Sequence, residues 1–213
     1  MVNKRKVLES IILFFLTILP AKFIQYLSKK ISGFFQICYG CYLKMLLNKL
    51  GDNFAFEYPV ILKGPQYIEI GDRFSSRSHF RIEAWDKFQD STYTPEIKIG
   101  NNVIFNFNCH LGSINLIKIG NNVLVGSNVL ITDHTHGEVT NSALAIIPSE
   151  RPLYSKGAVI IEDNVWIGEN VSILGNVHIG ENSIIGANSV VTSNVPANCV
   201  VGGIPSKIIK RLV

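Results

Sequence analysis

Aliphatic side chains recur at every sixth position through the second half of the chain. One run holds this phase through six successive units: Ile161, Ile167, Ile173, Ile179, Ile185 and Val191. A period of six matches neither an α-helix nor an isolated amphipathic strand. It is typical of a parallel β-helix, in which six-residue units form flat sides, three sides form a coil, and the aliphatic residues stack inward. Since the hexad form is left-handed, an exception among crossover connections, we predict an all-β fold, a left-handed parallel β-helix.

Small and polar residues follow the aliphatic positions, where the chain must turn a corner. Gly100-Asn101-Asn102 and Gly120-Asn121-Asn122 are the clearest cases, and these residue types tolerate the positive φ angles of tight corners. The repeat is interrupted twice. Ile99 to Ile119 is two residues longer than three hexads, which predicts a bulge between Gly112 and Leu116. Residues 137–157 break the repeat altogether, and a long loop that leaves a rigid solenoid is usually functional.

Periodicity and charge divide the chain into three predicted parts: a basic, apolar helical segment over residues 1–52, the β-helix over 53–205, and a C-terminal tail over 206–213. Residues 1–50 carry eight basic side chains and one acid, whereas the remainder is slightly acidic. The β-helix therefore lacks the basic stripe that binding to nucleic acid needs. The four cysteines make no disulfide framework in a chain of this length, and the single Cys38-x-x-Cys41 pair favours ordinary packing.

An apolar run from Ile11 to Pro20 follows Lys4-Arg5-Lys6. The run is shorter than the roughly twenty residues of a transmembrane helix, and no small-residue cleavage site of a signal peptide follows it. Two interpretations stay open. Residues 1–50 lie on a membrane surface with their lysines toward anionic lipid, or they pack as helices on the β-helix or on a neighbouring subunit. We expect a cytoplasmic protein, which the first interpretation would place at the inner face of the cell membrane.

A segment rich in titratable side chains, Thr132-Asp133-His134-Thr135-His136, stands immediately before the long loop. A histidine at the base of a loop on a rigid scaffold is well placed to accept a proton near neutral pH. Asn106 lies about one coil earlier, so we expect it near His134. The alternative is that His134 is an ordinary hydrogen-bonded surface histidine. His110 and His136 are secondary candidates for substrate contacts, with the same alternative.

The order of these motifs resembles the hexapeptide-repeat acetyltransferases. The matching features are the repeat, the Thr-Asp-His segment, the loop, Ile161-Glu-Asp-Asn-Val-Trp166-Ile-Gly168, and Val201-Gly-Gly-Ile-Pro205-Ser-Lys207. The similarity covers roughly Ile99 to Leu212 and not residues 1–50. It is greatest to the maltose, galactoside and nodulation-type O-acetyltransferases and to their relatives in capsule and O-antigen biosynthesis.

The resemblance implies acetyl transfer from acetyl-CoA to a hydroxyl of a sugar or glycan intermediate of capsule, O-antigen or exopolysaccharide. It also implies a homotrimer with sites between subunits, and no metal. His134 takes the position of the family's catalytic histidine, the general base, and Asn106 that of an asparagine at the acceptor site. Positions along the acetyl-CoA path are Trp166, Gly168, Ala187, Thr192, Lys207, Lys210 and Arg211. The two lysines stand where the sugar enzymes carry arginines for the CoA phosphates.

Three positions depart from the sugar acetyltransferases. An aspartate that contacts their acceptor corresponds to about Ile114, a Thr-Lys pair to Thr192-Ser193, and a serine on the CoA path to Glu169. These differences argue against a galactoside or maltose acceptor and leave acetyl transfer in place.

Three other functions share parts of the pattern. The same fold supports N-acetylation of an amino sugar. A metal enzyme of the γ-carbonic-anhydrase kind needs three histidines around zinc, and the His-x-x-x-x-His spacing of that family is absent from the sequence. A non-catalytic solenoid would need neither His134 nor the loop beside it.

Overall fold

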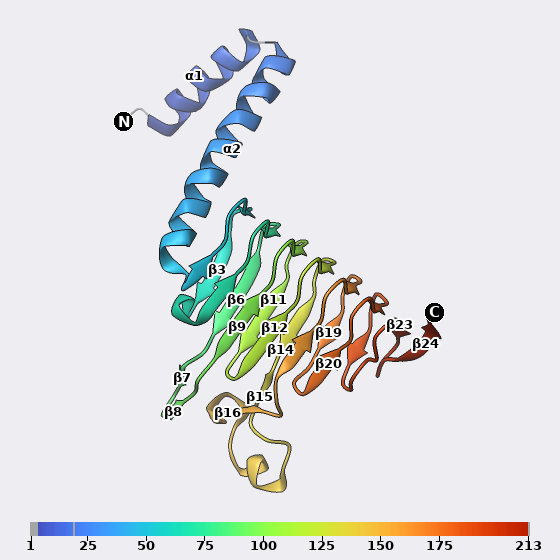
Figure 1. The fold of residues 1–213 in the computed structure, drawn as a ribbon. Coiled ribbons are helices and arrows are strands. Elements are labelled where there is room, and N and C mark those ends of the chain that lie inside the picture. Colours follow the sequence, from blue (N-terminus) through green and yellow to red (C-terminus); the bar gives the residue numbers. More distant parts are fainter. Residues whose placement is uncertain (1–3, 19, 213) are drawn as a thin grey trace.

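The computed structural model describes residues 4–18 and 20–212, and its body is a left-handed β-helix whose coils are built from three parallel sheets (Figure 1). The first sheet contains β1 (Lys49–Leu50), β4 (Ile68–Ile70), β9 (Glu96–Ile99), β12 (Leu116–Ile119), β17 (Val159–Ile161) and β20 (Val177–Ile179). The second contains β2 (Ala55–Phe56), β5 (Ser75–Ser76), β10 (Ile104–Phe105), β13 (Leu124–Val125), β18 (Trp166–Ile167), β21 (Ile184–Ile185), β23 (Cys199–Gly202) and β24 (Lys207–Arg211). The third contains β3 (Val60–Lys63), β6 (Phe80–Ala84), β11 (His110–Ser113), β14 (Leu130–Thr132), β19 (Ser172–Ile173) and β22 (Val190–Val191). The predicted fold class is confirmed.

The hexad residues point inward and stack in parallel register. In the first sheet Ile99, Ile119, Ile161 and Ile179 are successive partners, and all four are buried. Each such burial stabilises the fold by roughly 1.5–3 kcal/mol. Aromatic rings fill the first coils, with neighbouring centroids 4.9–6.0 Å apart, in the cluster Phe56, Phe74, Phe80 and Phe105. The core is therefore one continuous column along the axis.

Asparagines hold the corners where the sequence predicts tight turns. Asn102 and Asn122 have φ angles of 55° and 56°, in the left-handed region. Their side chains join successive coils, because Nδ2 of Asn102 donates to Oδ1 of Asn122 at 3.0 Å, and Nδ2 of Asn122 donates to Oδ1 of Asn164 at 3.0 Å. This ladder of asparagine side chains fixes the spacing between successive coils at this corner of the β-helix.

Two hairpins leave the β-helix at the corner between the third and first sheets (Figure 1). One is β7 (Lys87–Phe88) with β8 (Ser91–Thr92). The other is β15 (His134–His136) with β16 (Leu153–Ser155), which forms the base of the predicted loop and carries η2 (Asn141–Ala145) and η3 (Pro148–Glu150). The hairpins are tied together, since Gln89 Nε2 donates to the Ser149 carbonyl at 2.9 Å and the Tyr93 hydroxyl to the Leu153 carbonyl at 3.1 Å. The sequence predicts the second hairpin's loop but not the first hairpin.

The N-terminal part forms α1 (Lys4–Ile18) and α2 (Ala21–Leu46), which project from one end of the β-helix (Figure 1). The C-terminal part of α2 is anchored to the first coils, because Leu43 is buried and the Tyr39 hydroxyl donates to the Val60 carbonyl at 3.2 Å. The 3-10 helix η1 (Pro65–Tyr67) follows β3. Across the described residues, neither helix is long and apolar enough to cross a membrane. Leu19 of the predicted apolar run, residues 1–3 and Val213 lie outside the described residues.

Candidate active site

His134 is the first residue of β15, at the point where the chain leaves the third sheet. Its Nδ1 lies 3.0 Å from Oδ1 of Asp133, and its side chain is 15% exposed. Because a carboxylate at this distance accepts the Nδ1 proton, we assign the lone pair of the neutral ring to Nε2. Nε2 is then able to accept a proton from a bound hydroxyl.

Asp133 is fully buried and holds both the histidine and the backbone of the predicted bulge. Its carboxylate accepts hydrogen bonds from Ser113 Oγ at 2.7 Å, from the Ile114 N–H at 3.0 Å and from the Asn115 N–H at 2.9 Å. These donors satisfy a buried charge that would otherwise be costly. The two residues inserted after Gly112 thus serve to orient Asp133, and through it His134.

His134 lies on the boundary between two pockets. The downstream pocket, toward the C-terminal coils, has a volume of about 300 Å³ and is lined by Asp133, His134, Thr135, Tyr154, Lys156, Leu174, Gly175, Asn176 and Thr192. The upstream pocket, toward the N-terminal coils, has a volume of about 240 Å³ and is lined by Arg81, Glu83, Trp85, Phe88, His110, His134, His136 and Leu153. One imidazole therefore reaches two separate binding spaces, as a group that moves a proton between two substrates must.

The two hairpins build the walls of the upstream pocket. Trp85 and Phe88 come from the first hairpin, with ring centroids 6.0 Å apart, and Phe88 meets His136 of the second hairpin edge-on at 5.4 Å. Nζ of Lys63 lies 2.9 Å from the centroid of the Trp85 ring, a cation–π contact that fixes the indole. The pocket thus combines an aromatic wall with the polar floor of the third sheet.

Glu83 is the centre of that floor. Its Oε2 lies 2.7 Å from Nη2 of Arg81 and 3.4 Å from Nε2 of His110. The contact with His110 is electrostatic rather than a well-formed hydrogen bond, because Nε2 of His110 is enclosed without a hydrogen-bond partner among the described residues. Burial by itself would raise the pKa of Glu83, but its contacts with His110 and Arg81 outweigh burial and lower that pKa to about 2. Glu83 is therefore a carboxylate at neutral pH.

Asn106 does not lie near His134 within one chain, contrary to the expectation from its position one coil earlier. It follows β10 at the corner between the second and third sheets, whereas His134 leaves the corner between the third and first sheets. Its Nδ2 donates to the Val125 carbonyl at 3.0 Å. The number of coils between two residues gives their separation along the axis of the β-helix but not the corner at which each residue lies. Asn106 and His134 lie at different corners, with the third sheet between them.

The positions expected along the acetyl-CoA path fall into two groups. Thr192 lines the downstream pocket beside His134. Trp166 is 52% exposed on the second sheet. Gly168 and Ala187 are stacked in successive coils at the corner between the second and third sheets. The rest of this second group is exposed on β24, which pairs antiparallel with β23 at the end of the second sheet: Lys207, Lys210 and Arg211.

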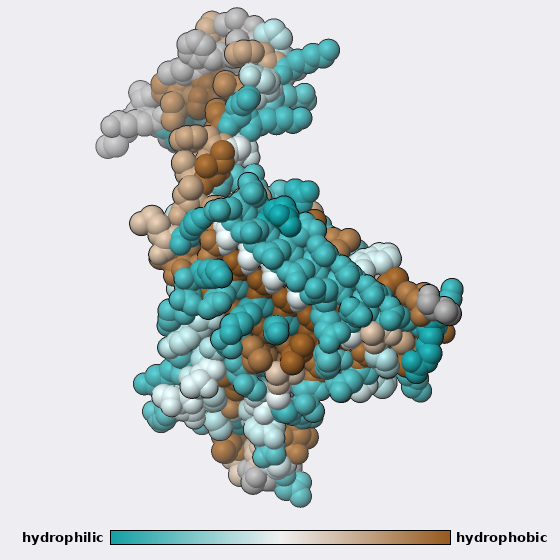
Figure 2. Space-filling model, in the orientation of Figure 1, coloured by the Kyte–Doolittle hydropathy of each residue, from teal (hydrophilic) through white to brown (hydrophobic). Residues whose placement is uncertain are grey.

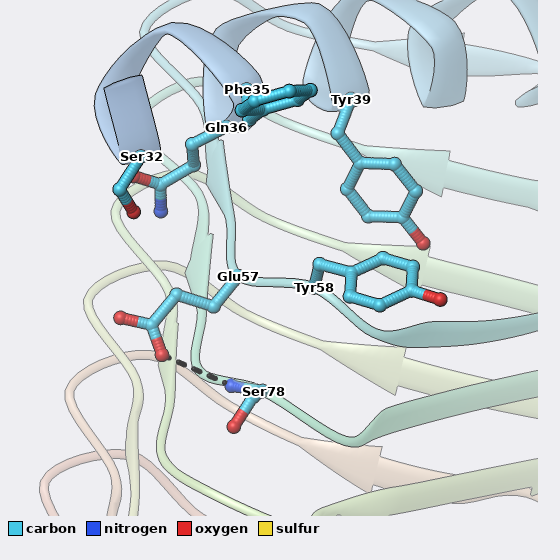
Figure 3. A pocket seen from close by; sticks show the side chains of 7 residues that line it. All are labelled: Ser32, Phe35, Gln36, Tyr39, Glu57, Tyr58 and Ser78. Atoms are coloured by element: carbon cyan, nitrogen blue, oxygen red, sulfur yellow. Dashed lines mark hydrogen bonds between the residues drawn. The ribbon is translucent and has the colours of Figure 1, made fainter. Parts of the chain in front are cut away.

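Two other arrangements in the chain do not compete for this chemistry. Within residues 4–18 and 20–212 there is no group of three side chains that could hold a metal ion. A larger cavity of about 450 Å³ lies between α2 and the first coils, lined by Ser32, Phe35, Gln36, Tyr39, Glu57, Tyr58 and Ser78 (Figure 3). Its one carboxylate, Glu57, pairs with Arg77 at 2.7 Å, so this cavity offers no catalytic base.

Comparison with known proteins identifies the family to which this geometry belongs. The bacterial transferase hexapeptide (six repeats) family matches residues 158–193. Over 157 residues the chain is 35% identical to an Escherichia coli K12 protein named as a lipopolysaccharide biosynthesis O-acetyl transferase, WbbJ, with 72% of this chain and 76% of that protein covered. The chain belongs to the hexapeptide-repeat acetyltransferase family.

Two solved structures resemble this acetyltransferase. A hexapeptide-repeat acetyltransferase of Vibrio cholerae complexed with acetyl coenzyme A is 26% identical with a TM-score of 0.57, and 80% of this chain and 74% of that one are covered. A galactoside acetyltransferase in complex with coenzyme A is 28% identical with a TM-score of 0.54, with 80% and 68% covered. The predicted family and enzyme class are confirmed, and acetyl-CoA as the predicted donor agrees with both complexes.

Sequence reasoning missed two features of this acetyltransferase's candidate site. Asp133 stands directly before His134 in the sequence. The predicted bulge was the signal for its role, because the backbone N–H groups of a bulge need an acceptor. Glu83, Trp85 and Phe88 carry no such signal, because they lie about fifty residues upstream of His134 and reach it only through the stacking of coils.

Proposed function

We propose that this acetyltransferase moves an acetyl group from acetyl-CoA to a hydroxyl of a sugar or glycan intermediate, with His134 as the general base. The observation that carries the proposal is the position of His134 on both pockets with Nδ1 held by Asp133. The acceptor occupies the upstream pocket and the thioester the downstream one. Holding both substrates in one complex supplies much of the rate, so no covalent acyl-enzyme is needed.

The reaction then follows from the residues. Nε2 of His134 takes the proton of the acceptor hydroxyl as its oxygen attacks the thioester carbonyl. A backbone N–H group stabilises the resulting oxyanion, a contribution often worth about 3 kcal/mol. The C–S bond breaks, and His134 returns its proton to the departing thiolate, which leaves the acetyl ester and free CoA. Asp133 orients the ring and balances the charge of the transient imidazolium.

The two separated groups of acetyl-CoA positions favour a homotrimer with sites between subunits. Thr192 and His134 share one corner, whereas Trp166 and Ala187 face outward from the second sheet. A threefold arrangement would bring the second sheet of one subunit against the His134 corner of the next. Asn106, on the same far corner, would then reach the acceptor site of the neighbouring subunit.

The outer face of the second sheet fits such a contact. Its outward positions in successive coils are paired in register and apolar: Ile104, Leu124, Trp166 and Ile184. Beyond this ladder, the cationic strand β24 would meet the phosphates of CoA through Lys207, Lys210 and Arg211, since charge-assisted contacts with phosphate are strong. An apolar face that ends in cations matches a ligand with an apolar arm and a phosphorylated nucleotide.

We further infer that α1 and α2 attach the enzyme to the inner face of the cell membrane without crossing it. Large hydrophobic side chains are exposed along both helices, including Leu13, Phe23, Phe34 and Ile37. Hydrophobic residues also gather along the projecting helices in Figure 2. Lys22, Lys29 and Lys30 lie on the same segment, and each basic contact with an anionic leaflet is worth about 1 kcal/mol. An acceptor anchored to that membrane would lie close to the enzyme.

The acceptor class is tested in cells. Mass spectrometry of the surface polysaccharide, with and without the gene, should show an acetyl increment only when the gene is present. Mild alkali should then remove the increment, because esters hydrolyse where amides survive. An alkali-stable increment would favour N-acetylation instead, and identical polysaccharides would contradict a glycan acceptor.

A further inference from the structure

The geometry points to Glu83 as the residue that selects the acceptor: we propose that it binds a second hydroxyl of a pyranose ring while the neighbouring hydroxyl reacts at His134. This inference rests on the proposed function and adds to it a sugar-recognition site in the upstream pocket. Three features carry it: two imidazoles that converge beside Glu83, an unused carboxylate oxygen, and an aromatic wall.

The two imidazoles converge over Gly112. In the third sheet Gly112 pairs in register with Glu83 of the preceding coil and Thr132 of the following one. A methyl group on Gly112 would come within 3.3 Å of Cε1 of His134 and 3.4 Å of Nε2 of His110. The absence of a side chain at Gly112 therefore lets both histidine rings approach this point of the sheet, beside Glu83 in the upstream pocket.

The hydrogen bonds of this carboxylate–imidazole pair are incomplete. Among the described residues, the contacts of the Glu83 carboxylate go to Oε2, from Arg81 at 2.7 Å, from Trp85 Nε1 at 3.4 Å and from His110 at 3.4 Å, which leaves Oε1 without a partner there. Apart from that long contact, the buried Nε2 of His110 makes no hydrogen bond within the described part of the chain. A hydroxyl both donates and accepts a hydrogen bond, so one hydroxyl satisfies a carboxylate oxygen and a ring N–H together. Unpaired polar atoms at such a site disfavour ligands that lack the matching group.

The aromatic wall indicates that this hydroxyl belongs to a ring. Trp85 is fixed by Lys63, and Phe88 is packed against His136, so neither ring turns freely. Rigid aromatic faces beside hydroxyl-binding groups match a pyranose, which has an apolar C–H face and a polar edge. The ring would rest on the wall, with one hydroxyl at His134 and its neighbour at Glu83.

The test uses the full-length enzyme, acetyl-CoA, and a panel of methyl hexopyranosides with their monodeoxy analogues. For the wild type, removing one particular hydroxyl next to the acetylated one should lower kcat/KM about tenfold or more. Glu83→Gln should raise KM for the parent pyranoside by a similar factor, with a smaller effect on kcat. In this variant, replacing the parent pyranoside with that deoxy analogue should lower kcat/KM only slightly further, because the two changes remove the same contact. The dissociation constant of acetyl-CoA should not change.

A matched control is available in Glu162, which pairs with His178 at 2.8 Å on the first sheet, away from both pockets. Glu162→Gln should behave as the wild type. If Glu83→Gln fails to fold, as judged by thermal unfolding, His110→Gln should give the same non-additive pattern. Unchanged discrimination among the deoxy analogues in a folded variant, or a wild type that acetylates no pyranoside, would overturn the inference. Failure of the proposed function is recognised separately, by His134→Ala retaining transfer.

Discussion

In the proposed mechanism, the histidine at the centre of the site is prepared for reaction by three residues that do not react. Asp133 fixes the Nδ1 proton at 3.0 Å, and the backbone N–H groups of Ile114 and Asn115 fix Asp133. Such preorganisation removes the cost of arranging the base during the reaction. On the other side of Gly112, Glu83 and His110 form a second carboxylate–imidazole pair of different geometry, in which the carboxylate has the free oxygen. We propose that the first pair transfers the proton and the second recognises the acceptor.

Glu83 also makes stability depend on pH in a predictable direction. Its pKa falls from 4.5 to about 2 in the folded state. A carboxylate with a depressed pKa stabilises the fold above its unfolded pKa, and that stabilisation is lost as the pH falls toward the folded pKa. The loss is at most about 3 kcal/mol for this shift.

We therefore expect the free energy of unfolding of the wild type to fall more steeply than that of Glu83→Gln between about pH 5 and pH 2. Urea denaturation at a series of pH values measures the difference. The exposed Glu150 makes no ion pair with any described residue, so Glu150→Gln should follow the wild-type curve. Parallel curves for wild type and Glu83→Gln would show that the contacts with Arg81 and His110 do not stabilise the carboxylate.

At the scale of elements, β24 is the strand that we propose binds the phosphates of CoA. Lys207 and Lys210 are exposed on it, at the end of the second sheet. Replacing both with glutamate should weaken CoA about tenfold or more, because each contact between an ammonium and a phosphate is charge-assisted. Dephospho-CoA, which lacks the 3′-phosphate, should lose less affinity.

Isothermal titration of both ligands against the wild type and the double variant measures this difference. Lys87→Glu is the control, because it changes the charge at one position by the same amount as each of the two test substitutions. Lys87 is exposed on β7, far from β24 in the fold. An equal loss for CoA and dephospho-CoA would exclude β24 from the 3′-phosphate site.

The contrast between predicted and observed elements has a physical cause. A hexad repeat specifies its own structure, because each Ile or Val pairs with its equivalent one coil away, so the sheets and the Asn102 and Asn122 corners are readable from the sequence. The β7–β8 hairpin has no periodicity, and its meeting with β15–β16 depends on tertiary contacts such as Gln89 with Ser149. For the same reason His134 could be proposed as the base from its motif, whereas Glu83 and Trp85 could not be proposed, and Asn106 was expected at a different corner from the one that it occupies.

At the scale of the whole molecule, the enzyme combines a rigid column with a projecting helical pair. Among the described residues, the helices contact the β-helix through the second half of α2, at residues such as Tyr39, Leu43 and Lys44, and many large hydrophobic side chains of both helices are exposed. The full-length protein should float with vesicles that contain anionic lipid, and a chain starting at Asn53 should not. High salt should release the full-length protein, because surface charges are screened.

Identical flotation of the two chains would contradict membrane attachment. Resistance of the full-length protein to high salt and alkaline extraction would show a deeper insertion than we propose. Mass photometry of the same samples reports the oligomeric state, for which a trimer of the 213-residue chain is expected.

The central claim is that His134 moves the proton in acetyl transfer, and single-variant kinetics with a binding control test it most directly. His134→Ala should lower kcat for transfer from acetyl-CoA to an accepted pyranoside at least about a hundredfold. The dissociation constant of acetyl-CoA and the oligomeric state should not change. His178→Ala, at an exposed histidine on the first sheet, should keep the wild-type rate. A His134→Ala enzyme that turns over near the wild-type rate would contradict the account.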